Sequence, residues 1–227
     1  MLRLFGIARF GAGNSKGGGG LEHRLSGAAY LAANQALAFA LLVVLSPVLL
    51  TIAAILWRAD GAPLLFGHYR VGRNGRLFRC LKFRTMARDS ERLLSQLLAS
   101  DPAARAEWEA DHKLTNDPRV TAIGAFLRRT SLDELPQLLN VVRGDMVLVG
   151  PRPITVAELA RYGQARWHYL SVRPGLTGLW QVSGRNNLSY DERVHLDRDY
   201  VEQRNWLLDV SILALTAKVV AKRDGAY

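Results

Sequence analysis

The stretch ALAFALLVVLSPVLLTIAAILW, residues 36–57, has no charged side chain and decides how the chain is built. It lies in a longer uncharged segment, residues 28–57, which as one straight helix would be about 45 Å long. That length is well beyond the ~30 Å hydrocarbon core of a bilayer. Ser46 and Pro47 stand at the centre of the quoted stretch, and proline removes a helical hydrogen bond whose freed carbonyl a serine hydroxyl can satisfy. We therefore expect a membrane helix that is sharply broken at Ser46-Pro47.

Two topologies remain open for this segment. A kinked single-pass helix satisfies the hydropathy alone, whereas a re-entrant hairpin enters and leaves the membrane on the same face. A secretory signal is disfavoured, because the apolar run begins late and is too long. Basic residues lie on both sides of the segment: Arg3, Arg9, Lys16 and Arg24 before it, and Arg58, Arg70, Arg73 and Arg76 after it. Because the positive-inside rule places both flanks in the cytoplasm, the charges favour the hairpin.

The charge of the chain indicates an anionic partner. Thirty Lys and Arg against twenty Asp and Glu leave a net charge of +10 on 227 residues, which fits nucleic acid, an anionic membrane surface or a phosphate-bearing substrate. The tryptophans are not interleaved with basic residues in a way that predicts base stacking, so nucleic acid is not the expected partner. The single cysteine, Cys80, excludes an internal disulfide and is expected to be a buried, inert thiol.

The sequence divides into three parts. Residues 1–27 are rich in glycine and predict a flexible tail, residues 28–57 are expected to form the membrane helix, and residues 58–227 are expected to form a polar, basic domain outside the membrane. In that domain the patterns predict a small α/β (α+β) fold of short strands and amphipathic helices. The expected strands cover 64–69, 77–85 and 146–149, and the expected helices cover 87–110 with an interruption near 101–102, 132–142, 190–203 and 206–222.

The densest group of chemically active residues is RRTSLDELP, residues 128–136. Ser131 followed by Glu134 is a capping-box pattern, which places Asp133 in the first turn of a helix. Free backbone N–H groups there favour the ionised carboxylate. An ionised aspartate near Arg128 suits a nucleophile that attacks a phosphate, with Mg²⁺ bridging the two anions. Seen alone, the pattern more often marks an ordinary helix start.

Basic side chains elsewhere are candidates for binding an anion. In GPRP, residues 150–153, two prolines fix the backbone around Arg152, whose guanidinium suits a phosphate or a uracil carbonyl. A rigid loop with a solvated arginine is an equally good interpretation. Lys82 and Arg84 lie two residues apart, so a strand would present both on one face, as an anion platform or as an ordinary polar face.

A glycine-punctuated stretch, residues 173–186, carries several hydrogen-bond donors. Arg173, Gln181 and Arg185 could belong to a loop that binds a sugar nucleotide, or the stretch could consist of turns alone.

The order of these motifs resembles the bacterial sugar transferase family, the monotopic phosphoglycosyl transferases. The shared motifs are KFRTM (82–86), DPRVT (117–121), SLDELPQ (131–137), GDM (144–146), GPRP (150–153) and RPGLTGLWQ (173–181). The match runs from residue 28 to the C-terminus, and the overall pattern looks most like the short galactosyl-1-phosphate transferases of exopolysaccharide synthesis. The resemblance implies a re-entrant membrane helix broken at a Ser-Pro pair, which carries a catalytic domain on the cytoplasmic face of the bacterial inner membrane.

The resemblance also implies a reaction. The enzyme would transfer sugar 1-phosphate from a UDP-sugar to undecaprenyl phosphate and release UMP, as the priming step of surface polysaccharide synthesis. Asp133 would be the nucleophile and a Mg²⁺ ligand, and Glu134 would assist it. Arg128 would lie close to the phosphates and Arg152 would hold the nucleotide. Galactose 1-phosphate is the expected group, and UDP-glucose as the donor remains open.

A different class of function remains as an alternative. The charge alone would also fit a non-catalytic, membrane-tethered basic adaptor that binds nucleic acid or anionic lipid. The pairing of Asp133 and Glu134 with rigid arginine loops does not predict such an adaptor. The oligomeric state cannot be read from the sequence, and a homodimer is among the options left open.

Overall fold

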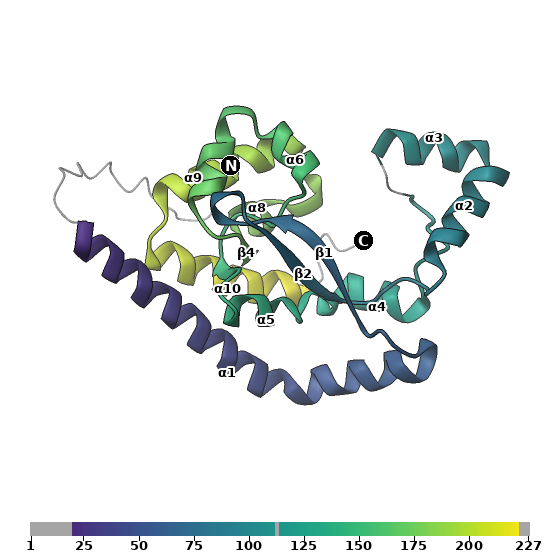
Figure 1. Cartoon of the computed structure of the whole chain (residues 1–227), viewed down its shortest axis with the longest axis horizontal. Coiled ribbons are helices and arrows are strands. Elements are labelled where there is room, and N and C mark those ends of the chain that lie inside the picture. Colours follow the sequence, from purple (N-terminus) through teal and green to yellow (C-terminus); the bar gives the residue numbers. More distant parts are fainter. Residues whose placement is uncertain (1–19, 112–113, 223–227) are drawn as a thin grey trace.

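The computed structural model describes residues 20–111 and 114–222 as a mixed, helix-rich α/β fold. Helix α1 (Gly20–Asp60) begins the described part and runs along one edge of the molecule (Figure 1). The helix takes in residues 20–27, which the composition assigned to a flexible tail, and residues 1–19 of that tail lie outside the described residues. The predicted fold class is confirmed, with short strands and a long apolar helix in the expected places.

Helix α1 is continuous through Pro47 and changes direction near its middle (Figure 1). The Ser46 hydroxyl donates a hydrogen bond of 2.7 Å to the carbonyl of Val43. Val43 lies four residues before Pro47, so its carbonyl is the one that the missing N–H of proline leaves free. The predicted break at Ser46-Pro47 is therefore a bend inside one helix, with the serine satisfying the freed carbonyl as expected.

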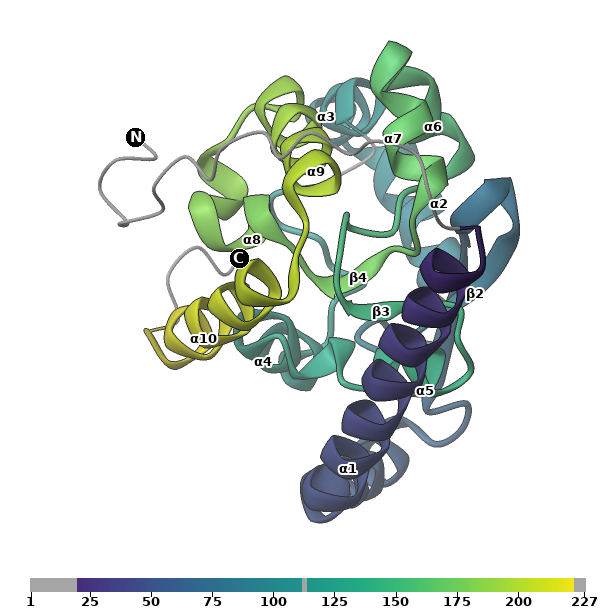
Figure 2. The ribbon, with the colours of Figure 1, turned by 90° about the vertical axis from the view of Figure 1, so that its left-hand side faces the viewer.

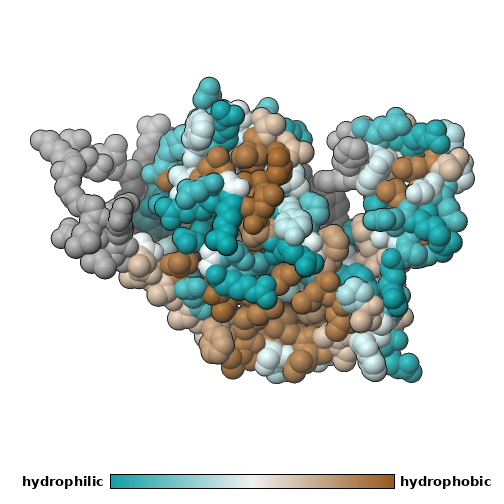
Figure 3. All heavy atoms as spheres, viewed as in Figure 1, coloured by the Kyte–Doolittle hydropathy of each residue, from teal (hydrophilic) through white to brown (hydrophobic). Residues whose placement is uncertain are grey.

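The surface of α1 is apolar and largely uncovered by the rest of the chain. Phe39, Val44 and Leu50 are 60%, 73% and 70% exposed, and only 11% of the residues in the most apolar part of the helix are buried. Figure 3 shows hydrophobic residues gathered along the lower edge of the molecule, over α1. A core helix of a soluble domain would be covered, so this surface is a membrane-associated one.

Polar side chains nevertheless join the N-terminal half of α1 to the domain. Asn34 Oδ1 accepts a hydrogen bond of 2.9 Å from the backbone N–H of Leu148, and Gln35 Nε2 donates one of 2.9 Å to the carbonyl of Val142. Ala38 is fully buried in the main core. The membrane helix is therefore packed into the fold at this end.

A β-hairpin follows α1. Strands β1 (Leu65–Val71) and β2 (Leu77–Phe83) pair antiparallel around the short helix η2 (Arg73–Gly75), in a register that aligns Leu65 with Phe83. The two predicted strands and their turn are confirmed. Side chains alternate between the faces of a strand, so Lys82 lies on the same face as the buried Phe78 and Cys80.

Two helices then project from the body in Figure 1. They are α2 (Ser90–Ser100) and α3 (Pro102–Asp111), so the interruption predicted near Asp101-Pro102 is confirmed. Helix α4 (Ala122–Thr130) leads to η3 (Leu132–Glu134) and α5 (Gln137–Val142). The single helix predicted over 132–142 is wrong, because the chain forms one 3₁₀ turn and restarts after Pro136.

The centre of the domain is a pair of parallel strands, β3 (Val147–Val149) and β4 (Gly175–Thr177). Figure 2 shows them in the middle of the body, with α1 on one side and α8, α9 and α10 on another. The remaining elements are α6 (Val156–Arg161), η4 (Gly163–Ala165), α7 (Arg166–Ser171), α8 (Leu179–Ser183), η5 (Arg185–Asn187), α9 (Tyr190–Gln203) and α10 (Trp206–Lys222). The main core joins these layers through residues such as Leu138, Met146, Tyr200 and Ile212.

A buried carboxyl in α9 gives the fold a measurable pH dependence. Asp197 is 2% exposed. Its Oδ2 accepts a hydrogen bond of 2.8 Å from the Tyr162 hydroxyl, and its Oδ1 has no partner among the described residues. Burial raises the pKa of Asp197 to about 7 and outweighs the Tyr162 hydrogen bond and the charge of Arg152, which lower it. The stability from this group is therefore complete below its unfolded pKa, near 4, and is lost as the pH rises through 7.

We expect Asp197→Asn to gain stability relative to the wild type as the pH rises from about 5 to about 8. The asparagine keeps an acceptor for Tyr162 and cannot ionise, and the two pH units between pH 5 and the folded pKa of about 7 correspond to at most about 3 kcal/mol. Thermal unfolding in detergent at several pH values measures the difference between the two proteins. A difference that stays constant with pH would show that Asp197 titrates normally.

Candidate active site

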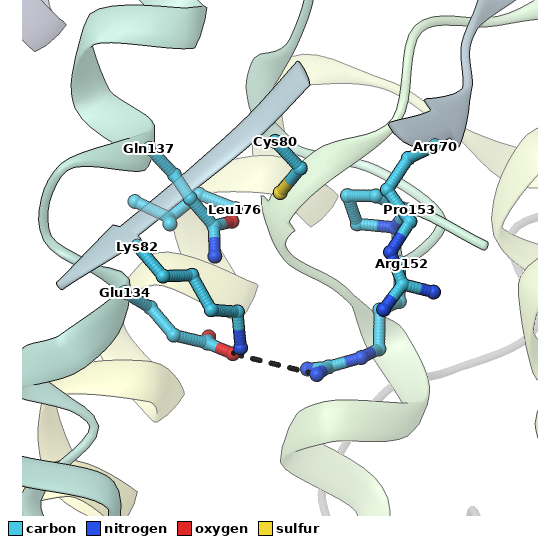
Figure 4. A pocket seen from close by; sticks show the side chains of 8 residues that line it. All are labelled: Arg70, Cys80, Lys82, Glu134, Gln137, Arg152, Pro153 and Leu176. Carbon is cyan, nitrogen blue, oxygen red and sulfur yellow. Dashed lines mark hydrogen bonds and ion pairs between the residues drawn. The ribbon is translucent and has the colours of Figure 1, made fainter. Parts of the chain in front are cut away.

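A small, open pocket lies between β2, the η3–α5 turn and the loop that follows β3. Figure 4 shows the side chains that surround it, with Lys82 and Glu134 facing Arg152. The lining residues are Arg70, Cys80, Lys82, Glu134, Gln137, Arg152, Pro153 and Leu176. Three of the eight are cations and one is an anion, so the lining favours a negatively charged ligand.

Lys82 joins the two acidic residues of the site. Its Nζ lies 2.7 Å from Glu134 Oε1 and 3.7 Å from Asp133 Oδ2. Arg152 Nη2 approaches the same Glu134 oxygen at 3.4 Å. Glu134 thus holds both cations in place, and Asp133 stands beside Lys82 without a bond of its own to Arg152.

The two carboxyl groups have opposite pKa shifts. Burial raises the pKa of Asp133, and the charge of Glu134 adds to this effect, while Lys82 and Arg128 oppose it. Burial would also raise the pKa of Glu134, but Arg152 and Lys82 outweigh it and lower the pKa to about 2. Glu134 is therefore a fixed anion, whereas Asp133 is the more basic carboxylate and the better nucleophile.

The turn that carries Asp133 differs from the one expected. Ser131 has the left-handed backbone conformation (φ 57°) that closes α4, and its side chain caps no helix. The capping box of Ser131 and Glu134 is therefore wrong, since Glu134 bonds to Lys82 instead. Asp133 does lie in the first turn of a helix, as predicted, but that helix is a single 3₁₀ turn and burial decides its pKa.

Two side-chain contacts fix this turn against the hairpin. Arg128 Nε donates to Thr85 Oγ1 at 2.9 Å, which holds the guanidinium near Asp133. The buried Asn140 bonds twice to one edge of β2, accepting from the N–H of Leu81 at 3.0 Å and donating to the carbonyl of Arg79 at 2.8 Å. Because Asn140 lies on α5, it sets the position of Lys82 relative to Glu134.

Arg152 owes its position to the parallel strand pair. The N–H of Gly175 donates to the carbonyl of Pro151 at 2.8 Å, and a Cβ on Gly175 would lie 2.1 Å from the backbone nitrogen of Gly150. Only glycine permits this close approach. The guanidinium of Arg152 lies 6.0 Å from the centre of the Trp180 ring, which covers it on one side.

Other predicted site residues lie outside the pocket. Arg84 donates to the carbonyls of Asp60 and Gly61 at the end of α1, so it does not share an anion-binding face with Lys82. Arg173 Nε donates to the carbonyl of Gly144 at 2.8 Å. Gln181 and Arg185 belong to α8 and η5 and do not line the pocket. Substrate contacts by these four residues stay predictions.

Several lining residues were missed from the sequence: Arg70, Cys80, Gln137, Pro153 and Leu176. The hairpin pattern could have indicated Cys80 and Arg70. Cys80 precedes Lys82 by two residues and so shares its face of β2, and it pairs with His68, which shares a face of β1 with Arg70. Cys80 is buried, as predicted, and burial raises the pKa of its thiol. Gln137 had a signal too, since residues three apart share a helix face and Glu134 precedes it by three.

The carboxylates of the site are compatible with a shared magnesium ion. Among the described residues, no three His, Cys, Asp or Glu side chains gather as a metal cluster. Mg²⁺ is commonly held by one or two carboxylates together with substrate phosphates, and Asp133 offers such an oxygen next to a cationic pocket. The donor set therefore fits an ion that a diphosphate completes.

Known proteins similar to this chain fall into two groups, one of about its own length and one more than twice as long. A Salmonella typhimurium protein named "Undecaprenyl-phosphate galactose phosphotransferase" is 57% identical over 82% of this chain, which spans 39% of that protein. "Exopolysaccharide production protein ExoY" of Sinorhizobium fredii is 48% identical over 82% of both chains. The Escherichia coli "UDP-glucose:undecaprenyl-phosphate glucose-1-phosphate transferase" is 36% identical over 79% of this chain and 37% of its own.

The family match covers nearly all of the described structure. The description "Bacterial sugar transferase" fits residues 28–223, which include α1, the hairpin, the pocket and the C-terminal helices. This extent, together with the relative of similar length, agrees with the order of motifs and with the Asp133–Lys82–Glu134 geometry. The chain belongs to the bacterial sugar transferase family.

Proposed function

We propose that this enzyme transfers a sugar 1-phosphate from a UDP-sugar to undecaprenyl phosphate and releases UMP. The observation that carries the proposal is Asp133, a buried carboxyl with a raised pKa whose Oδ2 lies 3.7 Å from Nζ of Lys82, a residue that lines the cationic pocket. A nucleophilic carboxylate beside fixed cations suits a phosphoryl transfer through a covalent intermediate. The names of the Salmonella and Escherichia coli relatives support the same reaction class.

The transfer would proceed in two displacements. An Asp133 oxygen attacks the phosphorus that bears the sugar, and the bond from that phosphorus to the bridging oxygen breaks, so UMP leaves with the electron pair. A phosphate oxygen of undecaprenyl phosphate then attacks the same phosphorus and the bond to Asp133 breaks. Lys82 and Arg152 neutralise the phosphate charge in both steps. Mg²⁺, held by Asp133 and the diphosphate, would add further charge neutralisation.

Galactose is the sugar that the relatives favour. The relative named for galactose is 57% identical to this chain, and the one named for glucose is 36% identical. The decisive experiment supplies purified protein with polyprenyl phosphate and UDP-galactose or UDP-glucose, and measures UMP. We expect UMP release that requires the lipid acceptor for sustained turnover and is faster with UDP-galactose. An inactive protein that still binds anionic lipid would restore the adaptor interpretation.

We further propose that α1 is re-entrant and holds the domain on the cytoplasmic face of the inner membrane. The bend at Pro47 and the basic residues on both flanks support this topology. Tags placed before residue 28 and after Tyr227 are expected to be accessible only from the cytoplasm. Tags on opposite sides would establish a single-pass helix instead.

A further inference from the structure

Gln137 is a buried side chain that the catalytic scheme does not use. It is the first residue of α5, is 3% exposed and lines the pocket. Figure 4 shows its carboxamide turned into the pocket, in the space between Lys82 and Leu176. No residue that the structure describes forms a hydrogen bond with this carboxamide.

Gln137 is buried as a residue, but its unbonded amide atoms are not fully enclosed, so they are open to the space of the pocket. Most buried side-chain polar groups have a partner, and a carboxamide carries two donors and an acceptor oxygen. The other buried amides follow the rule, since Asn34 and Asn140 each use both ends of the side chain in hydrogen bonds to the backbone. Gln137 is therefore placed to bond with something that enters the pocket.

The chemistry of the amide selects the kind of group it would bind. Phosphate oxygens only accept hydrogen bonds, and Lys82, Arg152 and Arg70 already offer cationic donors for them. A neutral carboxamide both donates and accepts, which matches a hydroxyl group. The neighbouring Cys80 and Leu176 give this end of the pocket an apolar wall, where an unmatched polar group would be penalised.

The position of Gln137 near Asp133 favours the hexose over the uridine as the part of the UDP-sugar that it contacts. Gln137 lines the pocket together with Glu134, the residue that follows Asp133. In a UDP-sugar the hexose is bonded directly to the phosphate that Asp133 would attack, whereas the uracil is separated from it by the ribose and a second phosphate. We propose that Gln137 is a substrate-binding residue that hydrogen-bonds a hydroxyl of the transferred hexose. This inference rests on the proposed function.

Gln137→Met tests the proposal, because methionine keeps the length of the side chain and removes the amide. The substrates are UDP-galactose, UDP-glucose and singly deoxygenated analogues of UDP-galactose, and kcat/KM is measured for each. Wild-type protein is expected to discriminate about 10- to 100-fold against one of these alternatives, and the variant is expected to lose that discrimination. Inhibition by UMP should be unchanged, and Gln96→Met on the exposed face of α2 is the matched control.

Either of two results would overturn the proposal. Equal weakening of UMP inhibition and of turnover would place Gln137 at the nucleotide. Unchanged ratios of kcat/KM between the UDP-sugars would show that Gln137 does not bind a hydroxyl of the hexose. Thermal unfolding checks that the variant is folded, and Gln137→Asn, which retracts the amide, repeats the test if methionine is not tolerated. If the wild type is active and Gln137→Met has the same ratios of kcat/KM between the UDP-sugars, this inference alone is wrong. If the wild type is inactive with every UDP-sugar, the proposed function is wrong as well.

Discussion

Asp133→Asn is expected to reduce UMP release by at least about 10³-fold. Asparagine has almost the same shape as aspartate, but its amide oxygen is a poor nucleophile and cannot carry the phosphosugar. The variant should still fold, since Asp133 makes no hydrogen bond within the described residues and its nearest cation, Lys82, remains bonded to Glu134. UMP release from UDP-galactose, measured with and without polyprenyl phosphate, gives the effect.

The covalent intermediate provides a second readout for the same variant. Wild-type protein incubated with a UDP-sugar labelled in the sugar, without acceptor lipid, is expected to retain label after denaturation, and Asp133→Asn is expected to retain none. Asp191→Asn, on the exposed face of α9, is the matched control and should behave like the wild type. Turnover that survives in Asp133→Asn would refute the assignment of the nucleophile.

Arg152→Met is expected to lower kcat/KM by about 10²- to 10³-fold. The guanidinium faces the pocket, and its loss removes a fixed donor for the diphosphate together with one of the two cations that hold Glu134. Glu134 would then depend on Lys82 alone, so its pKa would rise from about 2. Initial rates over a range of UDP-sugar concentrations separate the effect on KM from the effect on kcat.

Charge and geometry can be told apart at this position. Arg152→Lys keeps the positive charge and loses the planar pair of donors, so it should recover only part of the activity. Arg166→Met on the exposed surface of α7 removes the same charge far from the chemistry and should leave the rate unchanged. Full activity in Arg152→Lys would mean that a point charge suffices and that bidentate binding is not used.

Local pattern explains which elements were predictable. The helices over 190–203 and 206–222 have the predicted bounds, because each is long and starts with clear end signals such as Ser189 and its capping box. Strand β4 was not predicted, since three residues among glycines carry no periodicity and pair only with the distant β3. The helix over 132–142 was predicted as one element because its pattern continues across Pro136, where the structure ends the 3₁₀ turn and begins α5.

The candidate site was predictable in its parts but not in its assembly. Asp133, Glu134, Lys82 and Arg152 were all selected from short motifs, and the structure brings them together. Gln137 and Leu176 lie inside quoted motifs, SLDELPQ and RPGLTGLWQ, but only the folded chain brings them together with Arg70 around one pocket. Arg84 does not face the same way as Lys82, because a two-residue spacing keeps side chains on one face only inside a strand, and β2 ends at Phe83.

The hydrogen bonds from Asn34 and Gln35 have a consequence for where the enzyme can work. They attach the apolar helix α1 to Leu148 and Val142, and Leu148 lies on the strand that leads directly to Arg152. A fragment cut after α1 would lose these bonds together with the buried Ala38. Because α1 is joined to the strand that leads to Arg152, the depth of this helix in a membrane would set the height of the pocket above the lipid headgroups.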